Sequence, residues 1–138
     1  MKENTFPEGK LVLCIDDVPE FVTLITLFLK RFGVTVIGAG DGVEGLTKVR
    51  QMKPDLVLLD LMMPKMNGWE VYWQMQADEE LKDIPVIIVS VRSEMMDRKL
   101  ALESAKAEGY ITKPFAMQDL LLNVQRVLRA ENSITPLF

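Results

Sequence analysis

The stretch from Leu56 to Asp60 constrains the fold of this chain more than any other. Four apolar residues, Leu56–Leu59, follow one another without alternation and end on the carboxylate Asp60. An unbroken apolar run of this kind indicates a strand buried on both faces of a parallel sheet. Pro64 then prevents a central strand from continuing. A carboxylate at the carboxyl end of such a strand lies where open α/β sheets bind ligands, although aspartate is also a favoured turn residue.

The rest of the chain alternates short apolar runs with segments of helical spacing. Further strands are predicted over residues 11–15, 34–37, 84–89 and 110–112. Helices are predicted from Pro19 to Gly33, from Val43 to Pro54 with a cap at Asp41, from Trp69 to Asp78, beyond a cap at Ser93, and from Met117 to Leu128. Strands that alternate with helices indicate a parallel sheet covered by helices on both faces.

Apolar residues at helical spacing identify the faces expected to pack on the sheet. The expected core positions are Phe21, Leu24, Ile25 and Phe28 in the first helix, Val43, Leu46 and Val49 in the second, Met96, Leu100 and Ala101 in the fourth, and Met117, Leu120, Leu121, Val124, Val127 and Leu128 in the last. Val22, Leu27 and Leu29 widen the apolar face of the first helix, which indicates either a docking face or a wide core face. Trp69 and Trp73 share one face of the third helix, either exposed to a partner or packed on the helix's own flank.

Right-handed crossovers leave few topologies for such a sheet. The predicted fold class is α/β: a doubly wound five-stranded parallel sheet of order 2-1-3-4-5, as in flavodoxin-like (βα)5 folds. The switch point of that order lies between the first and third strands, which end on Asp16-Asp17 and on Asp60. Ser90 ends the fourth strand and Lys113 follows the fifth, so these polar side chains are expected at one edge of the sheet.

Composition argues against several other functions. The chain has 138 residues, enough for one domain with a core, and its formal charge of −4 argues against direct nucleic-acid binding. The longest apolar-rich segment is too short to span a membrane, and residues 1–10 lack the apolar core of a signal peptide. The one cysteine, Cys14, excludes an internal disulfide, so a reducing, cytoplasmic location is expected. Its apolar neighbours favour a buried core thiol over a reactive one.

The polar residues at the strand ends resemble the receiver domain of two-component response regulators, the CheY-like superfamily. The matching elements are Asp16-Asp17, Asp60, Ser90 and Lys113-Pro114-Phe115, with Met63-Pro64, Met66-Asn67-Gly68, Gly40-Asp41-Gly42 and Tyr110 in support. None of these elements is specific alone, but together they occur in the family's order, each at a predicted strand end. The resemblance covers about residues 10–130, which leaves residues 1–9 as an N-terminal extension and 131–138 as a C-terminal tail or linker stub.

The resemblance implies a phosphoryl-transfer site. Asp60 is the expected nucleophile, and Lys113 and Ser90 are expected to contact the phosphoryl oxygens. Ser90 and Tyr110 are the expected switch pair, against the alternative that Tyr110 is an ordinary half-buried strand residue. The family also holds the Lys113–Pro114 peptide cis, which directs the lysine back toward the site.

The resemblance also implies Mg²⁺ as the cofactor. Asp17, Asp60 and the main-chain carbonyl of Met62 are the expected direct ligands, and Asp16 is expected to act mainly through water. The physical reason is that three neighbouring carboxylates repel one another unless one holds a proton or a cation joins them. The alternative is a solvated acidic edge that binds ions loosely.

The implied function is Mg-dependent acceptance of a phosphoryl group on Asp60, followed by a change of the partner-binding face. Because the chain contains no histidine, the donor is expected to be a sensor histidine kinase, a phosphotransfer protein or a small acyl phosphate. The expected catalytic content is self-phosphorylation and slow self-dephosphorylation rather than turnover. Downstream, the resemblance implies an unknown target or an output domain, no membrane, and a monomer or phosphorylation-dependent homodimer.

Three residues near the site depart from the family pattern or are expected to tune it. Val91 follows Ser90 where a small residue is usual, and is predicted to slow both transfer and hydrolysis. Met62 cannot orient a water by hydrogen bonding, whereas Arg92 could shield the phosphate. The main alternative is therefore a pseudo-receiver that binds proteins without phosphorylation. A phosphohydrolase would need a second acid where Met62 stands, and a flavin carrier would need a glycine-rich phosphate loop after the first strand.

Overall fold

The strand predicted at the centre of the chain lies at the centre of the sheet. The structure is a computed structural model that describes residues 8–91, 99, 101–102 and 107–132. All four residues of β3 (Leu56–Leu59) are buried. The sheet has the order β2-β1-β3-β4-β5, and every neighbouring pair is parallel. The other strands are β1 (Leu11–Ile15), β2 (Thr35–Ala39), β4 (Val86–Ser90) and β5 (Gly109–Thr112). The predicted fold class is confirmed.

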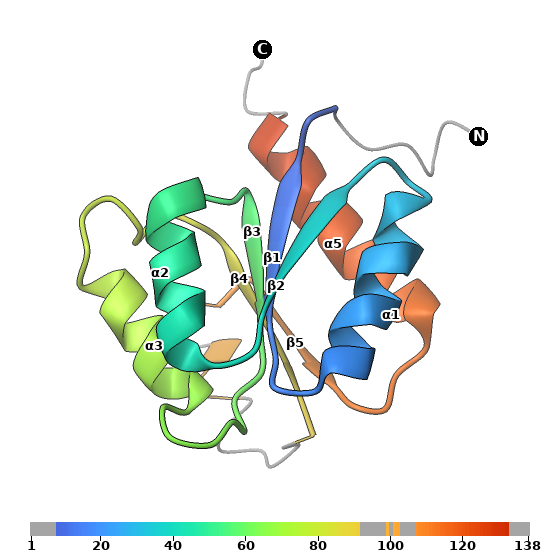
Figure 1. Ribbon diagram of the computed structural model, residues 1–138. Helices are drawn as coiled ribbons and strands as arrows, with labels where there is room; N and C mark the ends of the chain where they lie inside the picture. Colours follow the sequence, from blue (N-terminus) through green and yellow to red (C-terminus); the bar gives the residue numbers. More distant parts are fainter. Residues whose placement is uncertain (1–7, 92–98, 100, 103–106, 133–138) are drawn as a thin grey trace.

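Helices cover both faces of this sheet. The described helices are α1 (Pro19–Lys30), α2 (Gly42–Met52), α3 (Gly68–Gln76) and α5 (Met117–Asn132). Helices α2 and α3 lie on one face, and α1 and α5 on the other (Figure 1). Each face has its own apolar core, because the continuously apolar strands send side chains both ways. The helix predicted beyond Ser93, with Met96 and Leu100, falls on residues outside the described part, apart from Lys99, the buried Ala101 and the exposed Leu102.

Two core positions predicted from helical spacing are wrong. Leu24 of α1 is 51% exposed and Val43 of α2 is 63% exposed. The predicted Ile25 is fully buried in α1, together with Leu29, and Phe21 and Phe28 pack at their flanks. The apolar face of α1 is therefore wider than the strip that packs on the sheet, and its outer part faces solvent.

Strands β2 and β4 have other bounds than the sequence predicted. Strand β2 runs on through Gly38 and Ala39, which pair with Cys14 and Ile15 of β1. Gly38 fits there because α1 passes so close that a Cβ at this position would lie 2.4 Å from a methyl group of Val22. Strand β4 begins only at Val86 and includes Ser90.

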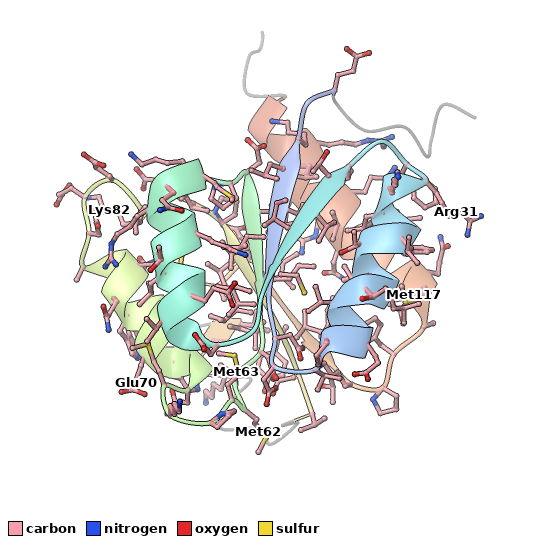
Figure 2. All side chains as sticks on the ribbon, viewed as in Figure 1. Arg31, Met62, Met63, Glu70, Lys82 and Met117 are labelled. Atoms are coloured by element: carbon pink, nitrogen blue, oxygen red, sulfur yellow. The ribbon has the colours of Figure 1, made fainter. Side chains whose placement is uncertain are left out.

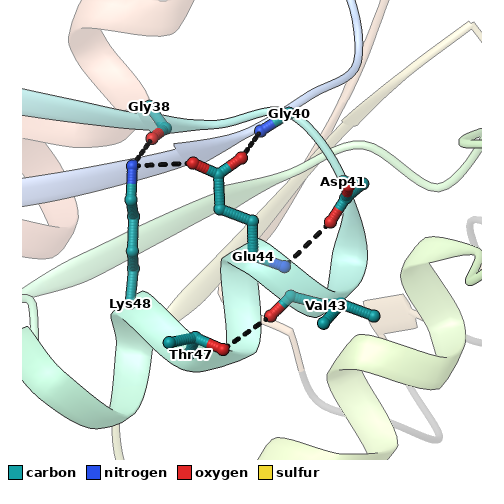
Figure 3. A network of polar contacts seen from close by, with 7 residues as sticks. All are labelled: Gly38, Gly40, Asp41, Val43, Glu44, Thr47 and Lys48. Atoms are coloured by element: carbon teal, nitrogen blue, oxygen red, sulfur yellow. Dashed lines mark hydrogen bonds and ion pairs between the residues drawn. The ribbon is translucent and has the colours of Figure 1, made fainter.

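Side chains fix the start of α2 beside the sheet edge. The predicted cap is confirmed, because the Asp41 side chain accepts the Glu44 N–H at 2.8 Å. Glu44 accepts the Gly40 N–H at 2.8 Å, and the Lys48 ammonium lies 3.0 Å from Glu44 and donates to the Gly38 carbonyl at 2.7 Å (Figure 3). These contacts lower the pKa of Glu44, the Gly40 N–H being the larger cause. The loop after β2 is thus tied to the helix that follows it.

The tryptophans of α3 form a pair on the flank of their own helix. Trp69 and Trp73 stack with ring centroids 6.0 Å apart and an interplanar angle of 22°. Val71 and Met75 are fully buried on the core side of α3. Trp73 remains 46% exposed, whereas Trp69 packs partly against the core.

Candidate functional site

Two neighbouring strands deliver the acidic residues to the same edge of the sheet. Ile15 and Leu59 are register partners at the ends of β1 and β3, so the next residues, Asp16 and Asp60, lie side by side. The Asp60 N–H donates to the Ile15 carbonyl at 3.0 Å, which extends the ladder to this carboxylate. Carboxylate oxygens of Asp16, Asp17 and Asp60 all lie within 4.8 Å of one another. We call these three residues the acidic cluster.

The members of the acidic cluster differ in burial. Asp16 is 2% exposed and Asp60 is 5% exposed, while Asp17 is more open to solvent. The Val18 N–H donates to Asp16 Oδ1 at 2.9 Å, and the Met62 N–H donates to Asp60 Oδ1 at 3.1 Å. These main-chain N–H groups orient the carboxylates of Asp16 and Asp60. Because both side chains are buried, water screens the repulsion between them only weakly.

Lys113 reaches the acidic cluster from the end of β5. Its ammonium lies 2.6 Å from Asp16 Oδ2, and its side chain is 16% exposed. The Lys113 N–H donates to the Ser90 carbonyl at 2.9 Å, which fastens the residue to the end of β4. The Lys113–Pro114 peptide is cis, as the resemblance implied. A compact cation therefore faces the acidic residues at 16, 17 and 60.

The Lys113 ammonium does not offset all the effects that raise the pKa of Asp60. Burial, the largest cause, raises the pKa of Asp60, and the charges of Asp16 and Asp17 raise it further. The Met62 N–H and the Lys113 ammonium act in the opposite direction, but the net shift is upward. Three convergent carboxylates are the hard oxygen donors that Mg²⁺ prefers. The chemistry of the donor set therefore fits this cation.

The other predicted site residues differ in burial. Ser90 ends β4 and is fully buried, and Tyr110 of β5 is 6% exposed, more buried than the half-buried residue weighed from the sequence. Met62 points away from the molecule and is 48% exposed, whereas Met63 points inward (Figure 2). Val91 is 57% exposed. Arg92 lies outside the described residues.

Gly68 shapes the loop that follows Asp60, a role that the sequence interpretation missed. Asn67 caps α3, accepting the Glu70 N–H at 3.1 Å, and Glu70 accepts the Asn67 N–H at 3.0 Å. Gly68 therefore lies in the first turn, where its N–H donates to the Leu61 carbonyl at 3.0 Å. A Cβ at position 68 would lie 2.2 Å from the Asp60 carbonyl oxygen. The signal was the capping-box spacing of Asn67 and Glu70.

An apolar groove lies beside Lys113. It has a volume of about 410 Å³, and its walls come from α1, the ends of β4 and β5, and the start of α5. The lining residues are Phe21, Leu24, Val91, Lys113, Pro114, Phe115 and Met117. The exposed Leu24, misplaced by helical spacing, belongs to this groove. We call it the α1–α5 groove.

The fold and the acidic cluster match a known family. The family model described as the response regulator receiver domain matches residues 12–125 of the chain. The chain belongs to this family. Among solved structures, the Vibrio cholerae chemotaxis protein CheY4 aligns with this receiver at a TM-score of 0.79 and 28% identity, over 86% of this chain and 98% of that chain.

Curated relatives of this receiver are longer proteins. The DNA-binding dual master transcriptional regulator RpaA of Synechocystis sp. is 36% identical over 123 residues, 89% of this chain and 51% of the relative. The alkaline phosphatase synthesis transcriptional regulatory protein PhoP of Bacillus subtilis is 37% identical over 128 residues, 93% of this chain and 52% of the relative. The receiver thus spans about half the length of the curated relatives it matches.

Among the described residues, no helix is long and apolar enough to cross a membrane.

Proposed function

We propose that this receiver accepts a phosphoryl group on Asp60, in a Mg-dependent reaction, from a sensor histidine kinase or a phosphotransfer protein. The observation that carries the proposal is the convergence of Asp16, Asp17 and Asp60 with the Lys113 ammonium at one edge of the sheet. Asp60 follows the last residue of β3, at the edge of the sheet where open α/β folds bind their ligands. The other acids would hold a cation, and the cation and the lysine together would neutralise the negative charge of the phosphoryl group.

The proposed transfer needs only one new bond. A carboxylate oxygen of Asp60 attacks the phosphorus in line, and the O–P bond forms as the donor's bond to phosphorus breaks. The bonding electron pair leaves on the imidazole nitrogen of a phosphohistidine, or on the carboxylate oxygen of a small acyl phosphate. The Met62 N–H, bonded to Asp60 Oδ1, holds the nucleophile in orientation. No proton has to be removed from Asp60 once its carboxylate is ionised.

The acidic cluster would hold the cation, together with the main-chain carbonyl of Met62. When bound, Mg²⁺ supplies positive charge that offsets both the carboxylates and the phosphoryl oxygens. The Lys113 ammonium, beside Asp16 at the acidic cluster, is proposed to supply a further positive charge for the phosphoryl oxygens. Ser90, buried at the end of β4, is proposed to donate its hydroxyl to another phosphoryl oxygen.

The α1–α5 groove is the proposed docking surface of the phosphodonor. It adjoins Lys113, and the exposed Leu24 lies in its wall. An apolar surface beside Lys113 suits a helical partner that brings its phosphohistidine to Asp60. The response to phosphorylation is proposed to be a population shift in which Ser90 moves toward the phosphoryl group and Tyr110 repacks.

Intact-mass measurement after incubation with Mg²⁺ and acetyl phosphate tests the function. Wild-type protein is expected to gain one phosphoryl group, and Asp60→Asn none. Asp83→Asn is the matched control, because Asp83 is exposed and lies outside the acidic cluster. No adduct on the wild type with acetyl phosphate or with a purified histidine-containing donor would favour the pseudo-receiver alternative instead.

A further inference from the structure

Lys113 makes a second contact besides the one to Asp16. Its ammonium nitrogen lies over the face of the Phe21 ring, 4.1 Å from the ring centroid. This is well inside the range in which the negative face of an aromatic ring attracts a cation. With only 16% of the lysine side chain exposed, water competes weakly for the ammonium. The charge is therefore held between a carboxylate oxygen and an aromatic face.

The Phe21 ring is held in turn by two elements. Phe21 lies in the first turn of α1, which begins at Pro19, two residues after Asp17. Phe115 packs against it edge to face, with centroids 6.1 Å apart and an interplanar angle of 88°. Because Phe115 follows Lys113 by two residues, the same loop supplies the cation and the ring that fixes the orientation of its aromatic partner.

A lysine side chain in such a site is difficult to hold in one orientation, and this arrangement restrains it. The lysine stem has four rotatable bonds, and its ammonium is strongly hydrated, so solvent competes for it. Asp16 alone offers one direction of attraction, at 2.6 Å. An aliphatic side chain at position 21 would fill the same volume but would give the ammonium no electrostatic partner on that side.

We propose that Phe21 is a positioning residue, whose ring face holds the Lys113 ammonium beside Asp16 in the orientation that phosphoryl transfer to Asp60 requires. The inference rests on the proposed function of Asp60 and adds a residue that the family motif does not contain. Phe21 does not touch the reacting atoms but acts through Lys113. The ring also lines the α1–α5 groove, so a docked donor would cover the cation–aromatic pair.

Fluorinated phenylalanines at position 21 test this role, because fluorine weakens the negative ring face with little change of shape. The series is 4-fluoro-, 3,5-difluoro- and 3,4,5-trifluorophenylalanine, and the measured quantity is the rate of phosphorylation by acetyl phosphate at saturating Mg²⁺. The rate is expected to fall at each step, and Phe21→Leu is expected to be about 5- to 30-fold slower than wild type. A phosphorylation rate that does not change with fluorination would overturn the proposal.

Phe28 provides the matched control on the same helix. It packs partly against the same apolar core and contacts Phe32 edge to face at 5.4 Å. The same fluorinated series at position 28 is expected to leave the rate unchanged. An equal response at both positions would assign the effect to general packing and would overturn the proposal.

An NMR measurement of Lys113 separates this inference from the proposed function, because it needs no phosphorylation. Methylene protons next to the ammonium are expected to be shifted upfield by the Phe21 ring, and to lose that shift in Phe21→Leu but keep it in Phe28→Leu. An absent shift would overturn the inference alone. A wild-type protein that shows the shift but is never phosphorylated would overturn the proposed function, and with it the role of Phe21 in transfer.

Discussion

The ammonium of Lys113 lies 2.6 Å from Asp16 Oδ2, joining residues that are 97 positions apart in the chain. The contact links the ends of β1 and β5, two strands that are not neighbours in the sheet. It also places the Lys113 ammonium against the most buried member of the acidic cluster. Both the stability and the reactivity of the site should therefore depend on this pair.

Removing the ammonium should destabilise the protein. In Lys113→Met the buried Asp16 carboxylate loses its partner, which is expected to lower the free energy of unfolding by about 3 kcal/mol without Mg²⁺. The loss should shrink when Mg²⁺ is added, because the cation neutralises the same carboxylate. Urea unfolding with and without Mg²⁺ measures both effects.

Lys82→Met is the control for that experiment. Lys82 pairs with Glu79 at 2.9 Å on the surface, with side-chain exposures of 43% and 86%. Such exposed pairs contribute little, so a change below about 1 kcal/mol is expected. Equal losses in Lys82→Met and Lys113→Met would contradict the importance of the Lys113–Asp16 pair.

Removing the charge of Asp60 should stabilise the metal-free protein at neutral pH. Its pKa is raised above 3.8, chiefly by burial, so the folded protein binds the proton more tightly than the unfolded chain. The contribution of Asp60 to stability is thus fully present below pH 3.8 and is lost as the pH rises through the raised pKa.

Thermal unfolding of Asp60→Asn in the presence of EDTA checks this direction. The variant is expected to have a higher Tm than the wild type at neutral pH, and the difference should shrink as the pH is lowered toward the raised pKa. Asp83→Asn, at an exposed position, should not show this pattern. A lower Tm for Asp60→Asn at neutral pH would contradict the account of Asp60 burial.

A methyl group at position 68 should disturb the loop after Asp60. In Gly68→Ala the new Cβ would lie 2.2 Å from the Asp60 carbonyl oxygen and 2.7 Å from Leu61 Cα, so the backbone must shift. The expected cost is roughly 1–3 kcal/mol of stability, accompanied by weaker Mg²⁺ binding measured by calorimetry. Gly40→Ala is the control, because its Cβ would meet only Glu44 Oε1, at 3.7 Å.

Cys14 should be inert in the folded protein. Burial, the largest cause, raises the pKa of its thiol from 9.0 to about 12. Iodoacetamide is expected to label it only after unfolding in urea, as measured by intact mass. Because the raised pKa favours the thiol in the folded state, stability should be unaffected below pH 9.0 and should fall between pH 9.0 and about 12. Rapid labelling under native conditions would contradict the burial.

The sequence predicted the sheet well because its strands are apolar on both faces. Runs such as Leu56–Leu59 favour a strand buried on both faces, and the acids that follow such strands are expected at the sheet edge. The buried faces of the helices were harder to predict. Helical spacing places Leu24 on the apolar face of α1, but it does not show that only a narrower strip of this face is buried. Contacts between distant segments, such as Phe21 with Lys113, cannot be predicted from the spacing of residues and are seen only in the structure.

The most direct test of the central claim locates the phosphoryl group chemically. After incubation with Mg²⁺ and acetyl phosphate, borohydride reduces an aspartyl phosphate to homoserine, and mass spectrometry of the peptides identifies the position. The account predicts homoserine at residue 60 in wild-type protein and in Asp83→Asn, dependent on Mg²⁺ and strongly reduced in Lys113→Met. Homoserine at another aspartate, or equal yield at residue 60 without Mg²⁺ and without Lys113, would contradict it.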